Sequence, residues 1–231
     1  MKRPLFTGEN IYHVFNRGVD KRDVFLDDVD RYQFIHDMFE FNDKALASTS
    51  YYKIRHESSE VELRKIKDRK PRTLLVDILA FCLMNNHFHF LLKQRIDGGI
   101  TKFMQKLAGY TRYFNNKYQR SGYLFEGKCK AVLVEKDAHF IHLPYYIHAN
   151  PLDLMKPEDR GNTEKELTFL KSYRWSSYLD YMGKKNFPSV TQREFLLSSF
   201  GNTEQHKKDF TQWLRLNNED KFSDISDIKI D

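Results

Sequence analysis

The segment from residue 74 to residue 93 constrains the fold of this chain more than any other. Leu74 to Met84 is strongly apolar, Asn85-Asn86 is a tight-turn signal, and His87 to Lys93 is a second extended run. Two such runs joined by a short polar turn predict a β-hairpin. The chain is therefore expected to build its core on an antiparallel sheet.

Helix-like and strand-like patterns surround this hairpin in a regular order. Before it, the sequence predicts a strand at Ile11 to Arg17 and an amphipathic helix capped by Asp27-Asp28. After it, the predicted elements are a helix from Ile100 to about Tyr118, a strand at residues 127–135 and a helix from Asp137 to about Asn150. Pro144 predicts a kink or a restart inside the last helix.

The order β-α-β-β-α-β-α contains two βαβ-like halves. It predicts an α+β fold, in which a ferredoxin-like antiparallel sheet carries helices on one face. In this layout the strand that begins at His87 is central, and the last helix can lie across it.

Two further segments stand outside that pattern. Residues 42–72 break the periodicity and are crowded with lysine and arginine, which predicts an inserted basic arm. We assign residues 1–154 to the main domain and residues 155–231 to a C-terminal extension. The extension is polar from Asn217 onward, and its end is expected to fray.

Composition limits the classes of protein to consider. The net charge of +6 and the pI near 9.1 favour an anionic partner. Cys82 and Cys129 lack the spacing of a zinc site or a disulfide framework. No apolar stretch approaches the roughly 20 residues that span a bilayer, and the N-terminus lacks an apolar signal region. We expect a soluble, cytoplasmic protein without membrane partners.

The chemistry-bearing residues are two histidines, a tyrosine and an asparagine. His87 and His89 are two apart in a strand, so both imidazoles project from one face. Tyr146 and Asn150 are four apart in a helix and also share a face. Two imidazoles, an amide oxygen and a phenol could form a divalent metal site beside a tyrosine nucleophile. That combination suits the cutting and rejoining of a phosphodiester.

These residues lie in motifs that resemble a known family. Residues 83–92 (LMNNHFHFLL) resemble the histidine motif of the single-tyrosine HUH transposases, the IS200-like superfamily, and residues 146–151 (YIHANP) resemble their tyrosine-helix motif. Residues 12–18 (YHVFNRG) and 173–178 (YRWSSY) resemble the REP-associated tyrosine transposase branch. The resemblance runs in order over roughly residues 10 to 180.

The resemblance implies a role for each matched position. His87, His89 and Asn150 would bind Mg or Mn, and Tyr146 would attack DNA to form a 5′-phosphotyrosine intermediate. The substrate would be single-stranded DNA with hairpin structure. The chain departs from the family at the turn, where Asn85-Asn86 replaces the usual Pro-Asn, and in the 42–72 insertion.

Several residues compete for these roles or could support them. Tyr145 is rotated away from the amide at Asn150, so it is the weaker nucleophile candidate. His142, one turn before Tyr146, could be a base, an extra ligand or a surface residue. Basic residues interleaved with aromatics suit single-stranded DNA, and the candidates are Arg112, Tyr113, Lys117, Tyr118, Arg120, Lys128 and Lys130. Arg174 and Trp175 could hold a DNA hairpin, although Trp175 could equally anchor the extension.

Two other functions are compatible with the sequence. A relaxase-like nicking enzyme would use the same residues at an origin, and a domesticated binding protein would use the same layout without catalysis. The target sequence, the preferred metal, the choice between monomer and homodimer, and tyrosine attack in cis or in trans stay open at this point.

Overall fold

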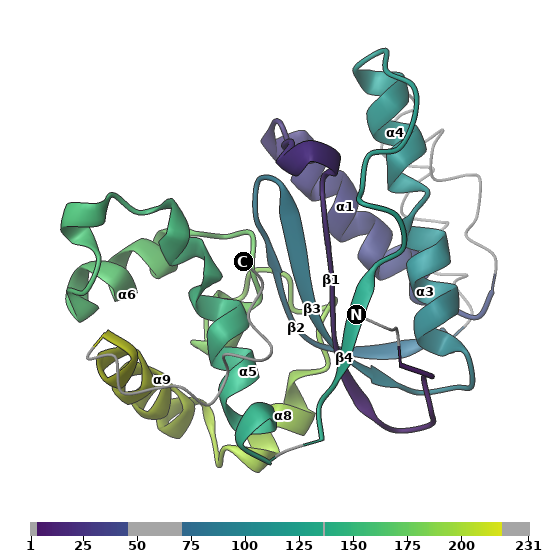
Figure 1. The fold of residues 1–231 in the computed structure, drawn as a ribbon. Helices are drawn as coiled ribbons and strands as arrows, with labels where there is room; N and C mark the ends of the chain where they lie inside the picture. Colours follow the sequence, from purple (N-terminus) through teal and green to yellow (C-terminus); the bar gives the residue numbers. More distant parts are fainter. Residues whose placement is uncertain (1–3, 46–70, 136, 219–231) are drawn as a thin grey trace, which may run out of the picture.

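The computed structural model describes residues 4–45, 71–135 and 137–218. Its centre is a four-stranded sheet in the order β2-β3-β1-β4 (Figure 1). The strands are β1 (Ile11–Arg17), β2 (Val76–Leu83), β3 (His87–Gln94) and β4 (Lys130–Leu133), and each neighbouring pair is antiparallel. The predicted α+β fold with a ferredoxin-like antiparallel sheet is confirmed, and the histidine strand β3 lies inside the sheet.

Alternation along β3 divides the core into two. Phe88, Phe90 and Leu92 belong to one buried cluster, whereas Leu91 belongs to the other. Because side chains two apart point to the same face, His87 and His89 share the face of Leu91. Each face of the sheet therefore needs its own covering layer.

The first face is covered by three helices. These are α1 (Asp28–Phe41), α3 (Gly99–Leu107) and α4 (Tyr110–Lys117), and Phe34, Phe90 and Phe103 are fully buried beneath them. Helix α1 begins after Asp27, within the cap that the sequence predicts, and Asp30 completes a capping box with it. This layer corresponds to the helices that the sequence predicts on one face of the sheet.

The helix predicted from Ile100 to Tyr118 is interrupted at Ala108 and Gly109. The Gly109 amide donates to the Lys106 carbonyl oxygen at 3.0 Å, which closes the last turn of α3 before α4 begins. Glycine in a helix interior costs roughly 1 kcal/mol relative to alanine. The single predicted helix is therefore two shorter ones.

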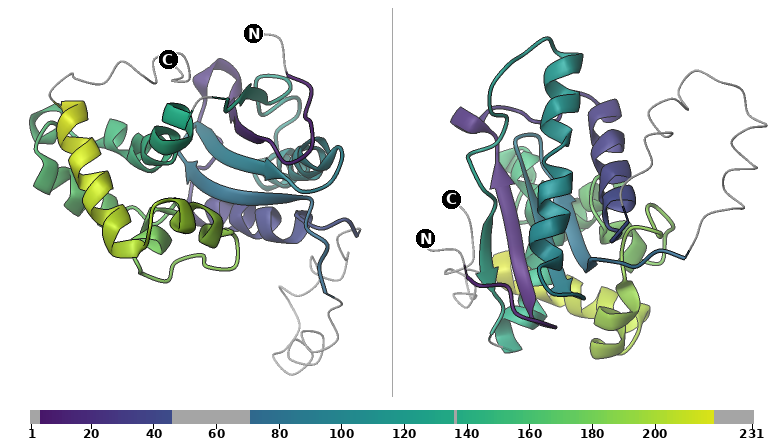
Figure 2. Two further views of the ribbon diagram at one scale, coloured as in Figure 1. Left: turned by 90° about the horizontal axis from the view of Figure 1, so that it is seen from below. Right: turned by 90° about the vertical axis from the view of Figure 1, so that its right-hand side faces the viewer.

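The second face carries an additional layer. Helix α5 (Asp137–Ala149) runs through Pro144 as one element and packs on β2 and β3. The elements that follow are η3 (Asn150–Leu154), η4 (Pro157–Asp159), α6 (Thr163–Ser172), α7 (Tyr178–Tyr181), α8 (Arg193–Ser199) and α9 (Thr203–Asn218). Figure 2 shows the two helical layers on opposite sides of the sheet.

Strand β2 lies at one end of the sheet, and the Trp-Ser-Ser segment covers its outer edge. Leu83 donates its amide to the Trp175 carbonyl at 2.9 Å, and Ser177 donates to the Phe81 carbonyl at 3.0 Å. Farther along the edge, Gln192 donates to the Ile78 carbonyl at 3.0 Å. An uncovered edge strand invites pairing with other chains, so this segment completes the sheet.

The predicted arm lies largely outside the described residues, which omit 46–70. The two described segments that flank residues 46–70 are hydrogen-bonded to each other, because the Lys44 amide donates to the Thr73 carbonyl at 2.8 Å. The end expected to fray lies outside the description from residue 219. Among the described helices, none has the length and apolar character needed to cross a membrane.

We expect His206 to make the stability of the second layer depend on pH. Its side chain is fully buried beside Tyr145, Tyr181 and Phe200, and both ring nitrogens lack hydrogen-bond partners among the described residues. Burial lowers its pKa from 6.5 to about 4, which means that the unfolded chain binds the proton more readily.

We expect the free energy of unfolding to fall as the pH drops from 6.5 toward 4, because the proton stabilises the unfolded state there. Urea unfolding at several pH values measures this slope, and His206→Gln should reduce it by the share of one histidine, because the other buried histidines also have lowered pKa values. An equal slope in both proteins would contradict the assignment to His206.

Candidate active site

The two histidines of β3 open the site. His87 begins the strand and is partly exposed, while His89 is 1% exposed. Their ring centroids are 5.0 Å apart. Alternation in the strand predicts this shared face, and it is the face that α5 covers.

Helix α5 brings the tyrosine to the histidines. The Tyr146 ring lies edge-on to the His89 ring, with 5.8 Å between centroids. One turn later, the Asn150 amide nitrogen donates to the Tyr146 carbonyl oxygen at 3.0 Å. Asn150 also lies within hydrogen-bonding reach of the His87 imidazole. All four residues singled out from the sequence therefore gather at one place.

Sequence reasoning missed a third histidine. His13 on β1 is fully buried, and its Nε2 lies 2.9 Å from His89 Nδ1. Its ring also lies edge-on to Tyr146, with 6.3 Å between centroids. The alternation of His13, Phe15 and Arg17 along the strand was a usable signal, but only the pairing of β1 with β3 connects it to His89.

The hydrogen bond to His13 determines which nitrogen of His89 faces the site. His89 Nε2 is buried and has no hydrogen-bond partner among the described residues. If His89 donates from Nδ1 to His13, its Nε2 keeps a lone pair, which is the form that binds a metal. A buried imidazole nitrogen left without a partner beside Tyr146 fits a metal ligand.

Asn86 has the same effect on His87. His87 Nδ1 lies 2.6 Å from Asn86 Oδ1, an atom that can only accept, so Nδ1 carries the proton and Nε2 the lone pair. Within the described residues, no group of three or more His, Cys, Asp or Glu side chains forms a metal site. The predicted ligand set has only two histidines and relies on an amide oxygen as its third member.

The Asn85-Asn86 turn is held by hydrogen bonds to the chain around it. The Asn85 carbonyl accepts from the amides of Val24 at 2.8 Å and Phe25 at 3.1 Å. Arg31 donates to Asn85 Oδ1 at 2.8 Å, and Asn86 donates from Nδ2 to the Lys21 carbonyl at 3.0 Å. The approach to His87 is thus fixed by contacts with the segment between β1 and α1.

The site electrostatics keep its imidazoles neutral. Burial lowers the pKa of His13 to about 3 and, together with the Arg17 charge, that of His87 to about 4. Burial, the neighbouring histidines and Arg17 lower the pKa of His89 well below its usual value. Neutral imidazole is the form that binds a metal, so the site is ready for a ligand role near pH 7.

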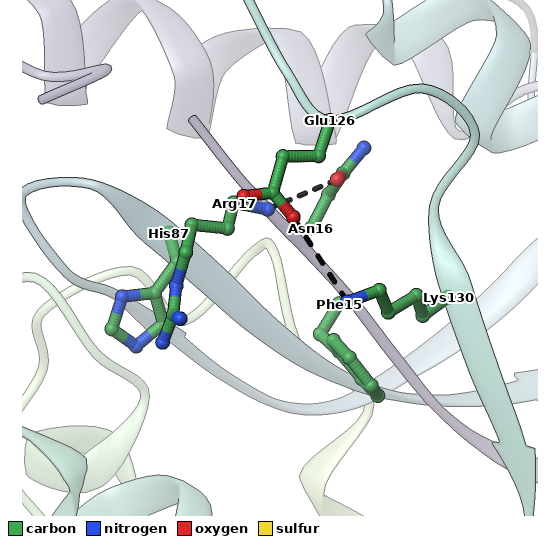
Figure 3. A pocket seen from close by; sticks show the side chains of 6 residues that line it. All are labelled: Phe15, Asn16, Arg17, His87, Glu126 and Lys130. Carbon is green, nitrogen blue, oxygen red and sulfur yellow. Dashed lines mark hydrogen bonds and ion pairs between the residues drawn. The ribbon is translucent and has the colours of Figure 1, made fainter. Parts of the chain in front are cut away.

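A small recess lies beside His87. It is lined by Phe15, Asn16, Arg17, His87, Glu126 and Lys130 (Figure 3). Lys130 Nζ is 3.9 Å from Glu126 Oε2, and the Arg17 guanidinium lies next to the His87 ring. The recess therefore places positive charge against the histidine pair.

The residues of α5 near Tyr146 lie mainly in the second core, the buried cluster between the sheet and the second helical layer. Tyr145 is 2% exposed and packs against Phe200, Phe210 and Trp213. Burial raises its pKa, which disfavours the phenolate. His148 is fully buried, with Nε2 2.8 Å from Ser177 Oγ. His142, the other candidate, is partly buried on α5.

The candidate DNA-contacting residues fall into two groups. Arg112, Lys128, Lys130 and Arg174 are exposed. In contrast, Lys117 pairs with Asp27 and Asp30 at 2.7 Å each, and the hydroxyls of Tyr113 and Tyr118 donate to Asp30. Arg120 donates to Asn115 at 2.8 Å. The second group tethers α4 to α1 or closes its own loop, so the first group has the more accessible charges.

Trp175 anchors the extension to the first layer. It is 7% exposed and packs edge-on against Tyr32 at 5.0 Å between centroids. The Arg174 guanidinium lies over the rings of Tyr32 and Trp175 at 5.1 and 5.3 Å. Of the two roles that the sequence left open for Trp175, the anchoring role is the one seen in the structure.

Comparison with known proteins supports the resemblance that the sequence motifs indicate. A family model described as "Transposase IS200 like" matches residues 45–150, the span that holds His87, His89, Tyr146 and Asn150. The chain resembles the IS200-like transposases. The match confirms the resemblance read from the motifs.

One solved structure is also similar to the chain. It is described as "Structure of the REP associates tyrosine transposase bound to a REP hairpin" and has a TM-score of 0.48 at 10% sequence identity. The similarity covers 82% of this chain and 89% of that chain. No curated protein matches the sequence.

Proposed function

We propose that this protein is a metal-dependent, single-tyrosine transposase that cuts and rejoins single-stranded, hairpin-containing DNA. The observation that carries the proposal is the position of Tyr146, whose ring lies 5.8 Å from that of His89 while Asn150 hydrogen-bonds its backbone. The match of residues 45–150 to the IS200-like transposases supports the same reaction class.

His87, His89 and Asn150 are the residues that would hold Mg or Mn. A divalent ion bound there would offset charge on the scissile phosphate and align it for in-line attack. The protein contributes two imidazoles whose Nδ1 atoms are engaged by His13 and Asn86, which would leave the Nε2 lone pairs for the ion. The Asn150 side chain contributes the oxygen.

Tyr146 supplies the nucleophile. Its hydroxyl oxygen forms a bond to phosphorus while the bond from phosphorus to the 3′ oxygen breaks. The phenol proton leaves to solvent, and the departing 3′ oxygen takes up a proton to become a free hydroxyl. Because a phosphodiester is retained in the 5′-phosphotyrosine, a second 3′-hydroxyl can reverse the step without ATP.

His13 acts as a positioning residue for His89. Hydrogen-bond partners behind a ligating histidine typically contribute 10–100-fold to metal affinity. We expect His13→Ala to weaken Mn²⁺ binding by about that factor, whereas His13→Gln, whose side-chain oxygen can accept from His89, should recover part of it. Isothermal titration with Mn²⁺ measures both, and unchanged affinity in His13→Ala would contradict this role.

The proposed function is tested with labelled single-stranded hairpin DNA and Mn²⁺ or Mg²⁺. The expected product is a protein–DNA adduct that survives denaturation, is absent with a chelator and is released when a 3′-hydroxyl strand is added. Hairpin binding without any adduct would indicate a domesticated binding protein. An adduct that never rejoins would indicate a relaxase-like nicking enzyme.

A further inference from the structure

We propose that Arg17 binds a non-bridging oxygen of the scissile phosphate, so that the phosphate lies between the guanidinium and the ion held by His87 and His89. This inference rests on the proposed function and adds a residue to its site. The ligand is the phosphodiester group of a DNA strand.

The sheet positions Arg17 for this contact. Arg17 ends β1 and is the direct cross-strand partner of His87 in the antiparallel register. Both residues line the same recess, and the guanidinium lies beside the imidazole (Figure 3). The backbone of Arg17 is fixed on both sides, because its amide donates to Asn16 Oδ1 at 3.0 Å and its carbonyl accepts from Glu126 at 2.8 Å.

With a divalent ion bound, the charges at this position would suit an anion. Arginine stays protonated in proteins, so the site would hold a fixed positive charge next to a divalent ion. Two cations at close range repel each other, and a guanidinium has no lone pair to offer the ion. A phosphate between them removes the repulsion and binds both, which gives Arg17 a function that it cannot have toward the metal alone.

The guanidinium suits this task better than the neighbouring lysine. Its planar set of donors matches the spacing of two phosphate oxygens. Lys130 also lines the recess, but its side chain is 54% exposed and faces Glu126 at 3.9 Å. We therefore assign the reacting phosphate to Arg17 and expect Lys130 to contribute less.

Mn²⁺ affinity with and without DNA tests the inference independently of cleavage. In a Tyr146→Phe background, hairpin DNA should tighten Mn²⁺ binding, and adding Arg17→Gln should remove most of that tightening. Without DNA, Arg17→Gln should leave Mn²⁺ affinity equal or higher, because a repelling charge is gone. A drop in Mn²⁺ affinity without DNA would mean that Arg17 supports the ligands structurally, and tightening that persists in Arg17→Gln would overturn the proposal.

The rate of single-turnover cleavage is the second test of the Arg17 proposal. Arg17→Gln should slow adduct formation about 10²- to 10³-fold, the usual range for one donor that stabilises developing charge, and Arg17→Lys should recover part of it. Arg215→Gln, an equal charge loss on the exposed side of α9, is the matched control. Rates within threefold in Arg17→Gln and wild type overturn the inference alone, whereas absence of any wild-type adduct counts against the proposed function.

Discussion

Replacing Tyr146 with phenylalanine is expected to abolish the covalent adduct. Strand cleavage should slow by at least about 1,000-fold, which is the order of the rate loss when an enzyme loses its nucleophile. The substitution removes one oxygen atom, and the ring can keep its edge-on contacts with His13 and His89. Hairpin affinity should stay within threefold of wild type. Denaturing gels of single-turnover reactions measure cleavage, and fluorescence anisotropy measures binding.

Tyr145→Phe is the matched control, because it deletes the same atom one residue away. Tyr145 packs in the second core, away from the histidine pair. We expect its variant to form the adduct at a near-normal rate. An adduct that persists in Tyr146→Phe and disappears in Tyr145→Phe would reverse the assignment of the nucleophile.

The second large effect is expected at His89. His89→Ala removes the buried nitrogen that has no hydrogen-bond partner among the described residues, and with it one of the two proposed imidazole ligands. Mn²⁺ affinity should fall at least 100-fold and cleavage should become undetectable, as it should with a chelator in wild type. Calorimetric titration with Mn²⁺ and the cleavage assay test the two statements separately.

His206→Gln provides the control for removal of a buried histidine. His206 lies in the aromatic cluster of the second layer, among Tyr145, Tyr181 and Phe200. Its variant should change the melting temperature while leaving Mn²⁺ affinity intact. Wild-type Mn²⁺ affinity in His89→Ala would show that the histidine pair does not hold the metal.

The parts of the site that local geometry decides could be predicted from the sequence. A two-residue period places His87 beside His89, and a four-residue period places Tyr146 over Asn150. The Asn85-Asn86 turn and the strand at Ile11 to Arg17 likewise follow from short patterns. Each of these depends on neighbours within a few positions of the chain.

Features that depend on distant contacts could not be predicted. The link from His13 to His89 spans 76 positions and exists because β1 pairs with β3. Lys117 and Tyr118 read as DNA contacts in sequence, but Asp27 and Asp30 at the start of α1 engage them. No short-range pattern indicates which carboxylates will lie opposite an exposed-looking lysine.

The extension shows the same limit. The Trp-Ser-Ser segment has no strand periodicity of its own, yet it pairs with β2 along the edge of the sheet. Its position decides whether Trp175 packs inside the fold or meets DNA, and the structure packs it against Tyr32. The second helical layer is built from this extension and α5, so the predicted single helical face was only half of the arrangement.

Peptide mapping of the adduct tests the central claim most directly. After reaction with hairpin DNA and Mn²⁺, nuclease trimming and trypsin digestion, the peptide that begins at Asp137 carries both Tyr145 and Tyr146. Fragmentation between the two tyrosines locates the nucleotide. We predict that the added mass is on Tyr146 and is absent when Mn²⁺ is chelated. A nucleotide on Tyr145, on another residue, or formed equally without metal would contradict the account.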